Sequence, residues 1–260
     1  GIQTFNESIL KVLQRRHTAR QAIEAFQNCR AAGFQNISID LMYGLPGETL
    51  STWQQDLDQA LLLHPEHLSA YHLIYEEDTV LWKLREQHKV EEADEDLSVS
   101  LFSTLIDRLT SEGYDHYEIS NFSLPGLYSR HNSSYWTEKK YLGCGPSAHS
   151  YNGVSRQWNV ASLDTYIKGI SAGTPVFEIE ELDLYTRYND FVITRIRTEW
   201  GMPLSKLRDE FGEKLYDYCL RMAAPHLKQG TLELVNDILK LTRKGIFISD
   251  GIMSDMLWTD

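Results

Sequence analysis

The feature that most constrains the fold is a repeated alternation of amphipathic helices and short apolar strands. Residues 18–33 carry Thr18 and Gln21 at capping-box spacing, then an apolar stripe and a final glycine, and so predict a helix. Residues 36–42 alternate apolar and polar side chains, which predicts a strand. Because this order of elements is typical of βα units, we expect a parallel sheet or barrel.

The same order continues further along the chain. After a turn rich in Gly and Pro, we expect Ser51 and Gln54 to cap a second helix. Residues 68–75 predict a strand, and a helix that begins near Glu95 leads to another strand over residues 114–120. The predicted fold class is therefore α/β.

The first predicted strand places a carboxylate where active sites gather. Ile37 and Ile39 share one face of this strand, and Ser38 and Asp40 share the other. Since helices cover the outside of such a sheet, we expect the isoleucines to meet the helices and Asp40 to point into a barrel interior or crevice. The alternative is that Asp40 only caps a neighbouring loop.

The C-terminal part has a different pattern, in which helices precede two short apolar runs at residues 232–235 and 238–241. This pattern predicts a small, mostly helical, winged-helix-like domain. We therefore expect a barrel part over residues 1–155, a connecting segment over residues 156–181, and a C-terminal domain over residues 182–260.

The charge and the cysteines exclude several classes of protein. A net charge of -12 repels phosphate backbones, so we expect no nucleic-acid partner. No apolar run reaches the roughly 18 residues that a transmembrane helix needs. Cys29, Cys144 and Cys219 are too few and too scattered for a disulfide framework, which indicates a reducing cytoplasm. The chain begins at Gly1 without an initiator Met, so we expect a truncated protein.

Two neighbouring segments concentrate groups that bind ligands. Residues 131–136 read His-Asn-Ser-Ser-Tyr-Trp, and residues 143–150 form a run of small residues that contains another histidine. This composition is a poor basis for a packed helix or strand, so we interpret residues 131–136 as a binding segment in a loop. The alternative is that His131 bonds a loop carbonyl while Tyr135 and Trp136 anchor the core.

Several ordered motifs resemble one known family. They are Gly-Ile-Gln-Thr-Phe-Asn at residues 1–6, Ile-Asp-Leu-Met-Tyr-Gly-Leu-Pro-Gly at residues 39–47, Tyr-Glu-Ile-Ser-Asn-Phe at residues 117–122, and residues 143–150. Together they resemble the radical S-adenosylmethionine proteins related to oxygen-independent coproporphyrinogen III oxidase, along essentially the whole chain. The resemblance implies the later part of an incomplete parallel (β/α)6 barrel, followed by the small C-terminal domain of that family.

Within this family, the pattern His-Asn-x-x-Tyr-Trp resembles the signature of the HemW-like haem chaperone branch. The resemblance implies that haem is bound by His131, Asn132, Tyr135 and Trp136. An imidazole can ligate haem iron, so His131 is the candidate metal ligand. The flat rings of Tyr135 and Trp136 can pack against a porphyrin face.

The resemblance also implies a site for S-adenosylmethionine. Gln3, Arg15 and Asp40 match family positions that contact this cofactor. Ile74 and His149 match weaker, partly backbone contacts. A carboxylate suits an ammonium group or ribose hydroxyls, and a guanidinium suits a carboxylate. The alternatives are a surface role for Arg15, backbone pairing for Gln3, and packing roles for the last two.

The chemistry of the family requires a 4Fe-4S cluster held by three cysteines spaced CxxxCxxC. The chain has no such triplet, and neither Cys29 nor Cys144 can substitute for it. We therefore expect the cluster ligands in a part of the protein upstream of this chain. We also expect this chain alone neither to hold the cluster nor to generate a radical.

Three functions fit these features. The leading hypothesis is a haem chaperone that binds haem and transfers it to acceptor haemoproteins. The alternative is an enzyme, an oxygen-independent coproporphyrinogen III oxidase that carries out radical decarboxylation in porphyrin biosynthesis. The third is a non-catalytic module that docks partner proteins. The identity of the acceptor, the role of the radical chemistry, a peripheral membrane contact and a homodimer stay open.

Overall fold

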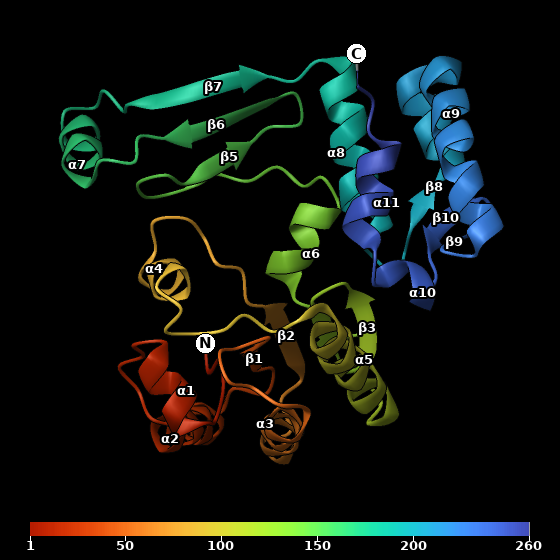
Figure 1. The fold of residues 1–260 in the computed structure, drawn as a ribbon. Helices are drawn as coiled ribbons and strands as arrows, with labels where there is room; N and C mark the ends of the chain where they lie inside the picture. The colour runs from red at the N-terminus through yellow and green to blue at the C-terminus, as the bar shows by residue number, and fades with distance from the viewer. Residues whose placement is uncertain (260) are drawn as a thin grey trace. The chain divides into compact units, whose positions relative to one another are not determined.

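The computed structural model describes residues 1–259, which group into two compact units, Gly1–Ser129 and Arg130–Asp260 (Figure 1). This grouping follows compactness alone, so the boundaries expected at residues 155 and 182 stay predictions. None of the helices within residues 1–259 is long and apolar enough to span a bilayer.

The first unit builds one sheet and five helices from its described residues. The helices are α1 Glu7–Val12, α2 Ala19–Ala31, α3 Leu50–Leu62, α4 Val80–Glu86 and α5 Glu95–Ser111. The strands are β1 Ser38–Tyr43, β2 His67–His72, β3 Asp115–Glu118 and β4 Asn121–Ser123, in the order β1-β2-β4-β3. β1 and β2 are parallel, and Gln3 adds a further parallel bridge to Leu41. The expected βα arrangement is therefore present.

The sheet is not parallel throughout. β4 runs antiparallel to both β2 and β3, so the single strand expected over residues 114–120 is instead the first arm of a hairpin. The hairpin turns within residues 119–120, where the Glu118 carboxylate accepts a hydrogen bond from the Ser120 N–H at 3.1 Å. β3 consequently keeps the direction of β1 and β2, and β4 reverses it.

The alternation predicted for Ile39 and Asp40 is confirmed, whereas Ile37 precedes β1 and is only partly buried. Ile39, Leu41 and Tyr43 are buried, whereas Ser38 is exposed and Asp40 is only partly buried. Burying a large aliphatic side chain stabilises a fold by about 1.5–3 kcal/mol, so this alternation is sufficient to fix which face of the strand carries Asp40.

Two of the helix starts test the capping arguments. α2 begins at the Thr18 capping box with Gln21, as predicted. The cap predicted for α3 at Ser51 and Gln54 is wrong, because Thr49 is the N-cap and forms the box with Thr52. Ser51 already lies inside the first turn.

The N-terminal segment is tied to α3 by a buried carboxylate. Asp56 accepts hydrogen bonds from the Thr4 hydroxyl at 2.5 Å and from the Phe5 N–H at 2.8 Å. Thr4 and Asp56 are both buried, and burial raises the pKa of Asp56 while these two hydrogen bonds lower it. The segment that carries Gln3 is thus held in place from the helix side.

The second unit contains two antiparallel sheets among its described residues. One sheet has the order β5-β6-β7, and the other has the order β8-β10-β9. The elements are α6 Arg130–Trp136, β5 His149–Tyr151, β6 Ser155–Asn159, α7 Leu163–Ser171, β7 Phe177–Glu181, α8 Leu184–Ile196, β8 Met202–Pro203, α9 Leu204–Gln229, β9 Leu232–Val235, β10 Ile238–Leu241, α10 Arg243–Ile246 and α11 Ser249–Met256. Residues 156–181, expected to connect two domains, therefore carry most of a sheet and a helix.

The expectation that residues 131–136 form a loop is wrong, because they lie in α6. The Ser134 hydroxyl donates to the His131 carbonyl at 2.6 Å, and the Thr137 hydroxyl donates to the Ser133 carbonyl at 2.8 Å. These side chains bond backbone carbonyls three or four residues earlier, a pattern compatible with a helix. A polar composition therefore did not prevent helix formation.

The winged-helix-like part has the predicted hairpin. β9 and β10 coincide with the two predicted apolar runs, and Asn236 and Asp237 between them adopt left-handed φ angles of 50° and 68°. Such angles at both central residues are typical of a tight hairpin turn. α9 is kinked at Gly212, whose φ of 79° and ψ of 170° suit glycine alone.

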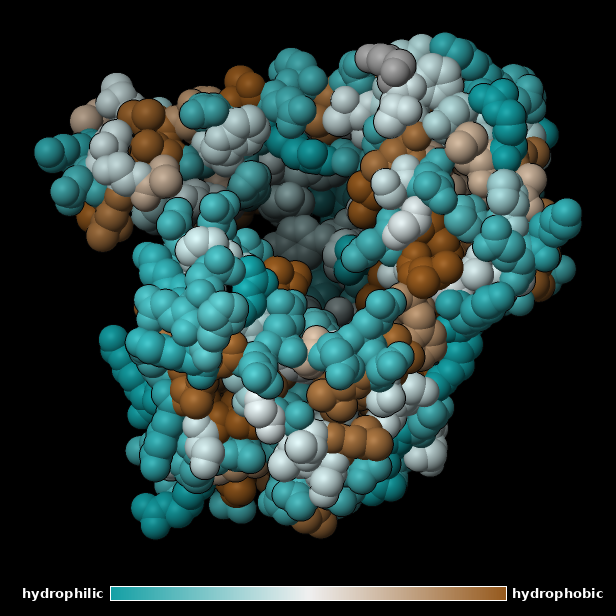
Figure 2. Space-filling model, in the orientation of Figure 1, coloured by the Kyte–Doolittle hydropathy of each residue, from teal (hydrophilic) through white to brown (hydrophobic). Residues whose placement is uncertain are grey.

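The face drawn in Figure 2 is mostly hydrophilic, and several hydrophobic residues gather over α7 in the second unit. On α7, Leu163, Ile167 and Ile170 are all more than half exposed. The apolar side of this helix is therefore turned largely to solvent.

Candidate functional site

Three of the residues expected to contact S-adenosylmethionine lie close together in the first unit. The Gln3 N–H donates to the Asp40 carbonyl at 2.8 Å, and the Gln3 carbonyl accepts from the Met42 N–H at 2.8 Å. Arg15 donates a hydrogen bond to the Gly1 carbonyl at 3.3 Å. Arg15 and Asp40 thus both contact residues 1–3, the segment that carries Gln3.

The other two expected residues are placed differently. Ile74 follows the end of β2 and is 71% exposed, so it does not pack in the core of its unit. His149 begins β5 in the second unit, where its ring stacks on Trp158 with centroids 5.9 Å apart. The structure does not group His149 with Gln3, Arg15 and Asp40 inside one unit.

The face of the sheet that carries Asp40 holds a polar chain that the sequence analysis missed. The Ser38 hydroxyl lies 2.7 Å from His67 Nδ1, and His67 Nε2 lies 2.6 Å from the Tyr117 hydroxyl. Burial lowers the pKa of His67 to about 4, although the charge of Asp40 raises it. Burial also raises the pKa of Tyr117. His67 is therefore neutral near pH 7 and links two hydroxyls beside Asp40.

The segment expected to bind haem presents a histidine and a tyrosine on one face of α6. His131 and Tyr135 are four residues apart, and their rings meet edge to face with centroids 5.1 Å apart. The Tyr135 hydroxyl lies 3.3 Å from His131 Nε2, and both residues are exposed. The alternative in which Tyr135 anchors the core is therefore wrong.

The remaining two residues of the motif are partly buried. Trp136 is covered on one face by the Arg197 guanidinium, 4.2 Å from the ring centroid, and its Nε1 has no hydrogen-bond partner within residues 1–259. Asn132 lies one residue beyond His131 and is partly buried as well. Trp136 thus lies between the surface and the interior of its unit.

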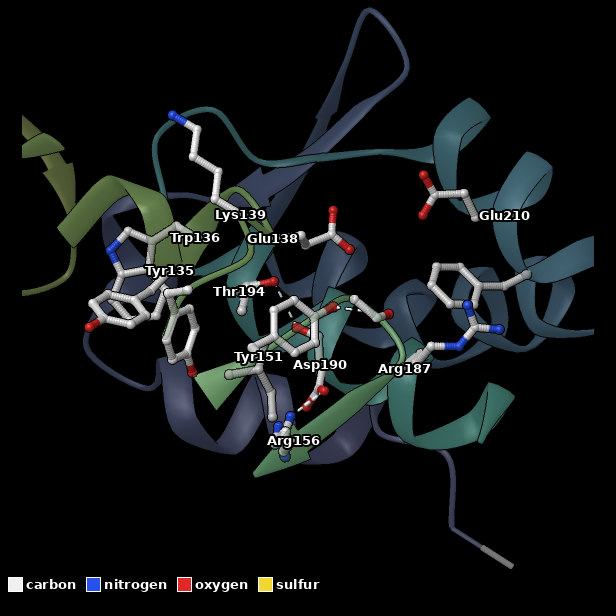
Figure 3. A pocket seen from close by; sticks show the side chains of 14 residues that line it. Tyr135, Trp136, Glu138, Lys139, Tyr151, Arg156, Arg187, Asp190, Thr194 and Glu210 are labelled. Atoms are coloured by element: carbon white, nitrogen blue, oxygen red, sulfur yellow. Dashed lines mark hydrogen bonds and ion pairs between the residues drawn. The ribbon is translucent and has the colours of Figure 1, made fainter. Parts of the chain in front are cut away.

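Beside α6, the second unit contains a cavity of about 510 Å³ (Figure 3). This volume lies within the roughly 300–1,000 Å³ range of small-molecule sites. Its walls come from the end of α6 and the segment after it, from β5 and β6, and from α8 and α9. The lining residues are Tyr135, Trp136, Glu138, Lys139, Tyr141, Tyr151, Gly153, Arg156, Arg187, Asp190, Ile193, Thr194, Glu210 and Phe211.

A row of aromatic rings joins the motif to this cavity. The rings of Tyr135 and Tyr141 meet at a centroid distance of 5.0 Å, and those of Tyr141 and Tyr151 at 6.1 Å. Burial raises the pKa of both Tyr141 and Tyr151, so their hydroxyls stay protonated near neutral pH. The cavity therefore offers neutral, flat surfaces next to His131.

The carboxylates of the cavity are paired with cations. Asp190 pairs with Arg156, and Glu138 accepts from Arg195 at 2.7 Å and from Lys206 at 2.8 Å. Burial opposes the ionisation of Glu138, but the hydrogen bonds from Lys206 and Arg195 outweigh it and hold its pKa below the ordinary value. Burial raises the pKa of Asp190 in spite of its partner Arg156.

The described residues do not fit an iron-sulfur cluster. Cys29 and Cys144 are exposed, and Cys219 is buried in a setting that raises its pKa to about 11. Within residues 1–259, no group of three or more His, Cys, Asp or Glu side chains is arranged to hold a metal ion. We therefore derive no chemistry through a cluster held by these residues.

Comparison with known proteins places both units in one family. The model of the Radical SAM superfamily matches residues 1–60, and the model of the HemN C-terminal domain matches residues 182–248. The fold is similar to that of coproporphyrinogen III oxidase (HemN) from Escherichia coli, with a TM-score of 0.80, 20% identity, and coverage of 98% of this chain and 62% of that one. The predicted α/β class with a partial radical S-adenosylmethionine barrel is thus confirmed.

Curated relatives match along the whole chain. The heme chaperone HemW of Lactococcus lactis is 31% identical over 263 residues, which cover 100% of this chain and 68% of that protein. The heme chaperone HemW of Bacillus subtilis is 29% identical over 258 residues, which cover 99% of this chain and 68% of that protein. The chain therefore belongs to the HemW family of radical S-adenosylmethionine proteins.

Proposed function

We propose that the protein carrying this chain is a haem chaperone, which binds haem at residues 131–136 and passes it to acceptor haemoproteins. The observation that carries this proposal is the exposed pair of His131 and Tyr135 on α6, beside a cavity lined with aromatic rings. The whole-chain match to relatives named heme chaperone HemW supports it.

The chemistry of these residues fits haem. When bound, haem would supply an iron centre and a flat, largely apolar macrocycle. His131 offers a ring nitrogen at the surface as the axial ligand, and Tyr135 and Trp136 offer rings for contact with the macrocycle. Asn132 offers an amide for a polar group at the edge of the macrocycle.

The proposal is tested by titrating haem into the full-length protein while the Soret band is recorded. His131→Ala is expected to change the position of the Soret band and to weaken binding, because the iron loses its axial nitrogen. His88→Ala, which removes an exposed histidine of the first unit, serves as the matched control. A Soret response unchanged in His131→Ala would contradict the assignment.

The alternative function is tested with the same protein. If the full-length protein with a reconstituted cluster converts coproporphyrinogen under anaerobic conditions, it is an oxidase rather than a chaperone. We expect no such turnover. The similarity to the Escherichia coli oxidase is 20% in sequence and supports a shared fold only.

We further propose that S-adenosylmethionine binds in the first unit at Gln3, Arg15 and Asp40, with weaker contributions from Ile74 and His149. The Asp40 carboxylate is 43% exposed and is thus accessible to an ammonium group or to ribose hydroxyls. We also propose that the protein carrying this chain binds the 4Fe-4S cluster that its family implies, through ligands other than Cys29, Cys144 and Cys219.

This second site is tested by calorimetric titration of S-adenosylmethionine into the full-length protein. Asp40→Asn is expected to weaken binding by about tenfold, the effect of losing one charge-assisted hydrogen bond. Asp58→Asn, which changes an exposed aspartate paired with Arg108, is the control. Equal affinity in wild type and Asp40→Asn would remove Asp40 from the site.

We also propose a cytoplasmic protein that contacts the membrane only peripherally and forms a homodimer. The two contacts are tested separately. Sedimentation with vesicles of anionic lipid tests the membrane contact. Light scattering of the protein eluted from a size-exclusion column tests the dimer. A monomer that stays in the supernatant would overturn both.

A further inference from the structure

The cavity beside α6 has more positive than negative charge available to a ligand. Each of its three carboxylates has a cationic partner, because Asp190 pairs with Arg156, and Glu138 and Glu210 both pair with Lys206. Two lining cations, Arg187 and Lys139, form no ion pair within residues 1–259. The lining therefore has two cations that no carboxylate neutralises, and the directions of their side chains decide which of them a ligand inside the cavity can meet.

Arg187 lies on the face of α8 that lines the cavity. It lies one turn before Asp190 on α8, so both side chains belong to the same face of the helix and line the same cavity. Arg187 is partly buried, and its charge acts on the Tyr151 hydroxyl and on Asp183 without an ion pair to either. Its guanidinium thus keeps its hydrogen-bonding capacity for another group.

The two ends of the cavity differ in chemistry. In Figure 3, Trp136 and Tyr135 lie at one end, Arg187 lies at the other, and Tyr151 lies between them. The Lys139 side chain extends from the rim, and its amine points away from Tyr151 and Arg187. A ligand that fills this space meets flat rings along its length and a planar guanidinium at its far end.

These features select a ligand class. Aromatic rings suit a flat macrocycle, and the forked donors of arginine match a carboxylate in a bidentate geometry. We propose that Arg187 anchors a carboxylate side chain of the porphyrin that enters this cavity from the His131 end. The proposal rests on the proposed haem-binding function and adds the residue that fixes the orientation of the macrocycle.

The test compares ligands with and without free carboxylates in the full-length protein. Arg187→Gln is expected to weaken haem binding by about tenfold, because one bidentate charge-assisted contact is lost. The Soret position of the bound form is expected to stay unchanged, since the axial ligand is retained. Haem dimethyl ester, whose carboxylates are blocked, is expected to bind wild type and Arg187→Gln equally.

Three control variants separate an anchor from a general effect. Lys139→Gln removes a cation from the same lining, and Arg221→Gln removes an exposed arginine from α9 of the same unit. Both are expected to bind haem as wild type does, and Arg187→Lys is expected to recover only part of the affinity. The proposal is overturned if Lys139→Gln weakens haem binding as much as Arg187→Gln does. It is also overturned if Arg187→Gln weakens the binding of the ester as much as the binding of haem.

A metal-free ligand distinguishes failure of the anchor from failure of the function. Binding of protoporphyrin IX, followed by quenching of tryptophan fluorescence, is expected to depend on Arg187 and not on His131. Haem binding that depends on His131 but not on Arg187 would overturn the proposed role of Arg187 and leave the proposed haem-binding function intact. Protoporphyrin binding that depends on Arg187, without any Soret response to His131→Ala, would support the anchor and refute the axial ligand.

Discussion

Glu48 is a carboxylate that the first unit holds almost entirely out of water, with 4% of its surface exposed. One oxygen accepts hydrogen bonds from the Gly44 N–H at 2.7 Å and the Leu45 N–H at 3.3 Å, and the other has no partner within residues 1–259. Burial raises the pKa of Glu48 to about 7, even though the two backbone hydrogen bonds lower it. We therefore predict that Glu48→Gln stabilises the first unit increasingly as the pH rises.

The size of the effect follows from the displaced pKa. An acid whose pKa is higher in the folded state contributes stability that is complete below its unfolded pKa and is lost as the pH rises through its folded pKa. For Glu48 this loss extends from about pH 4.5 to pH 7. At 1.36 kcal/mol for each unit of pKa, it amounts to about 3 kcal/mol of unfolding free energy.

The assay is urea unfolding of wild type and Glu48→Gln between pH 4.5 and 8, read from hydrogen exchange of peptides that contain α3. The difference in unfolding free energy between the two proteins is expected to shift by about 3 kcal/mol in favour of Glu48→Gln over this range. Glu24→Gln, which changes an exposed glutamate of α2, is expected to show no such shift. A Glu48→Gln difference that stays constant within about 0.5 kcal/mol would refute the argument.

His67 provides a comparison of opposite sign in the same pH range. Its pKa is lowered by burial to about 4, so the stability it contributes is complete above pH 6.5 and is lost as the pH falls through 4. His67→Gln is expected to remove this acid-side loss of unfolding free energy, which is again about 3 kcal/mol. Because the two effects have opposite signs, the unfolding free energy of wild type should vary less with pH than that of either variant.

Two further substitutions probe hydrogen bonding and packing. Thr4→Val deprives the buried Asp56 of a donor and is expected to cost about 1–3 kcal/mol of unfolding free energy, whereas Thr4→Ser keeps the hydroxyl and should cost much less; urea titration of both checks this. A Cβ at Gly245 would lie 1.9 Å from the Thr231 carbonyl oxygen, so Gly245→Ala is expected to lower the melting temperature of the second unit, while Gly251→Ala, with open space in α11, should raise it slightly in calorimetry.

The sequence predicted the elements whose signal is local. The alternation in residues 36–42 was sufficient to place Ile39 and Asp40 on opposite faces, because one face of the strand is buried against helices. The β3–β4 hairpin was missed because residues 119–120 at its turn include no Gly or Asn, the usual marks of a tight turn. The Glu118 carboxylate holds the turn instead, by accepting hydrogen bonds from the Ser120 N–H and the Asn121 side chain. A contact of that kind leaves no periodic pattern.

The candidate site was predicted by residue type and not by shape. The sequence pointed to His131 and its neighbours, yet it gave no indication of the cavity, whose far wall comes from α8 and α9. A further local signal was the spacing of Arg187 and Asp190, which places both on one face of α8. Because walls from distant segments meet only in the folded chain, a motif can be recognised well before its pocket.

The hydroxyl of Tyr135 has a consequence for how firmly a ligand is held. It lies 3.3 Å from His131 Nε2, one of the two ring nitrogens that could ligate iron. If His131 is the axial ligand, haem iron would have to displace this hydroxyl, and the lost hydrogen bond would lower the affinity for haem by about 0.5–1.5 kcal/mol. Tyr135 would then weaken the capture of haem and, by the same amount, favour its transfer to an acceptor.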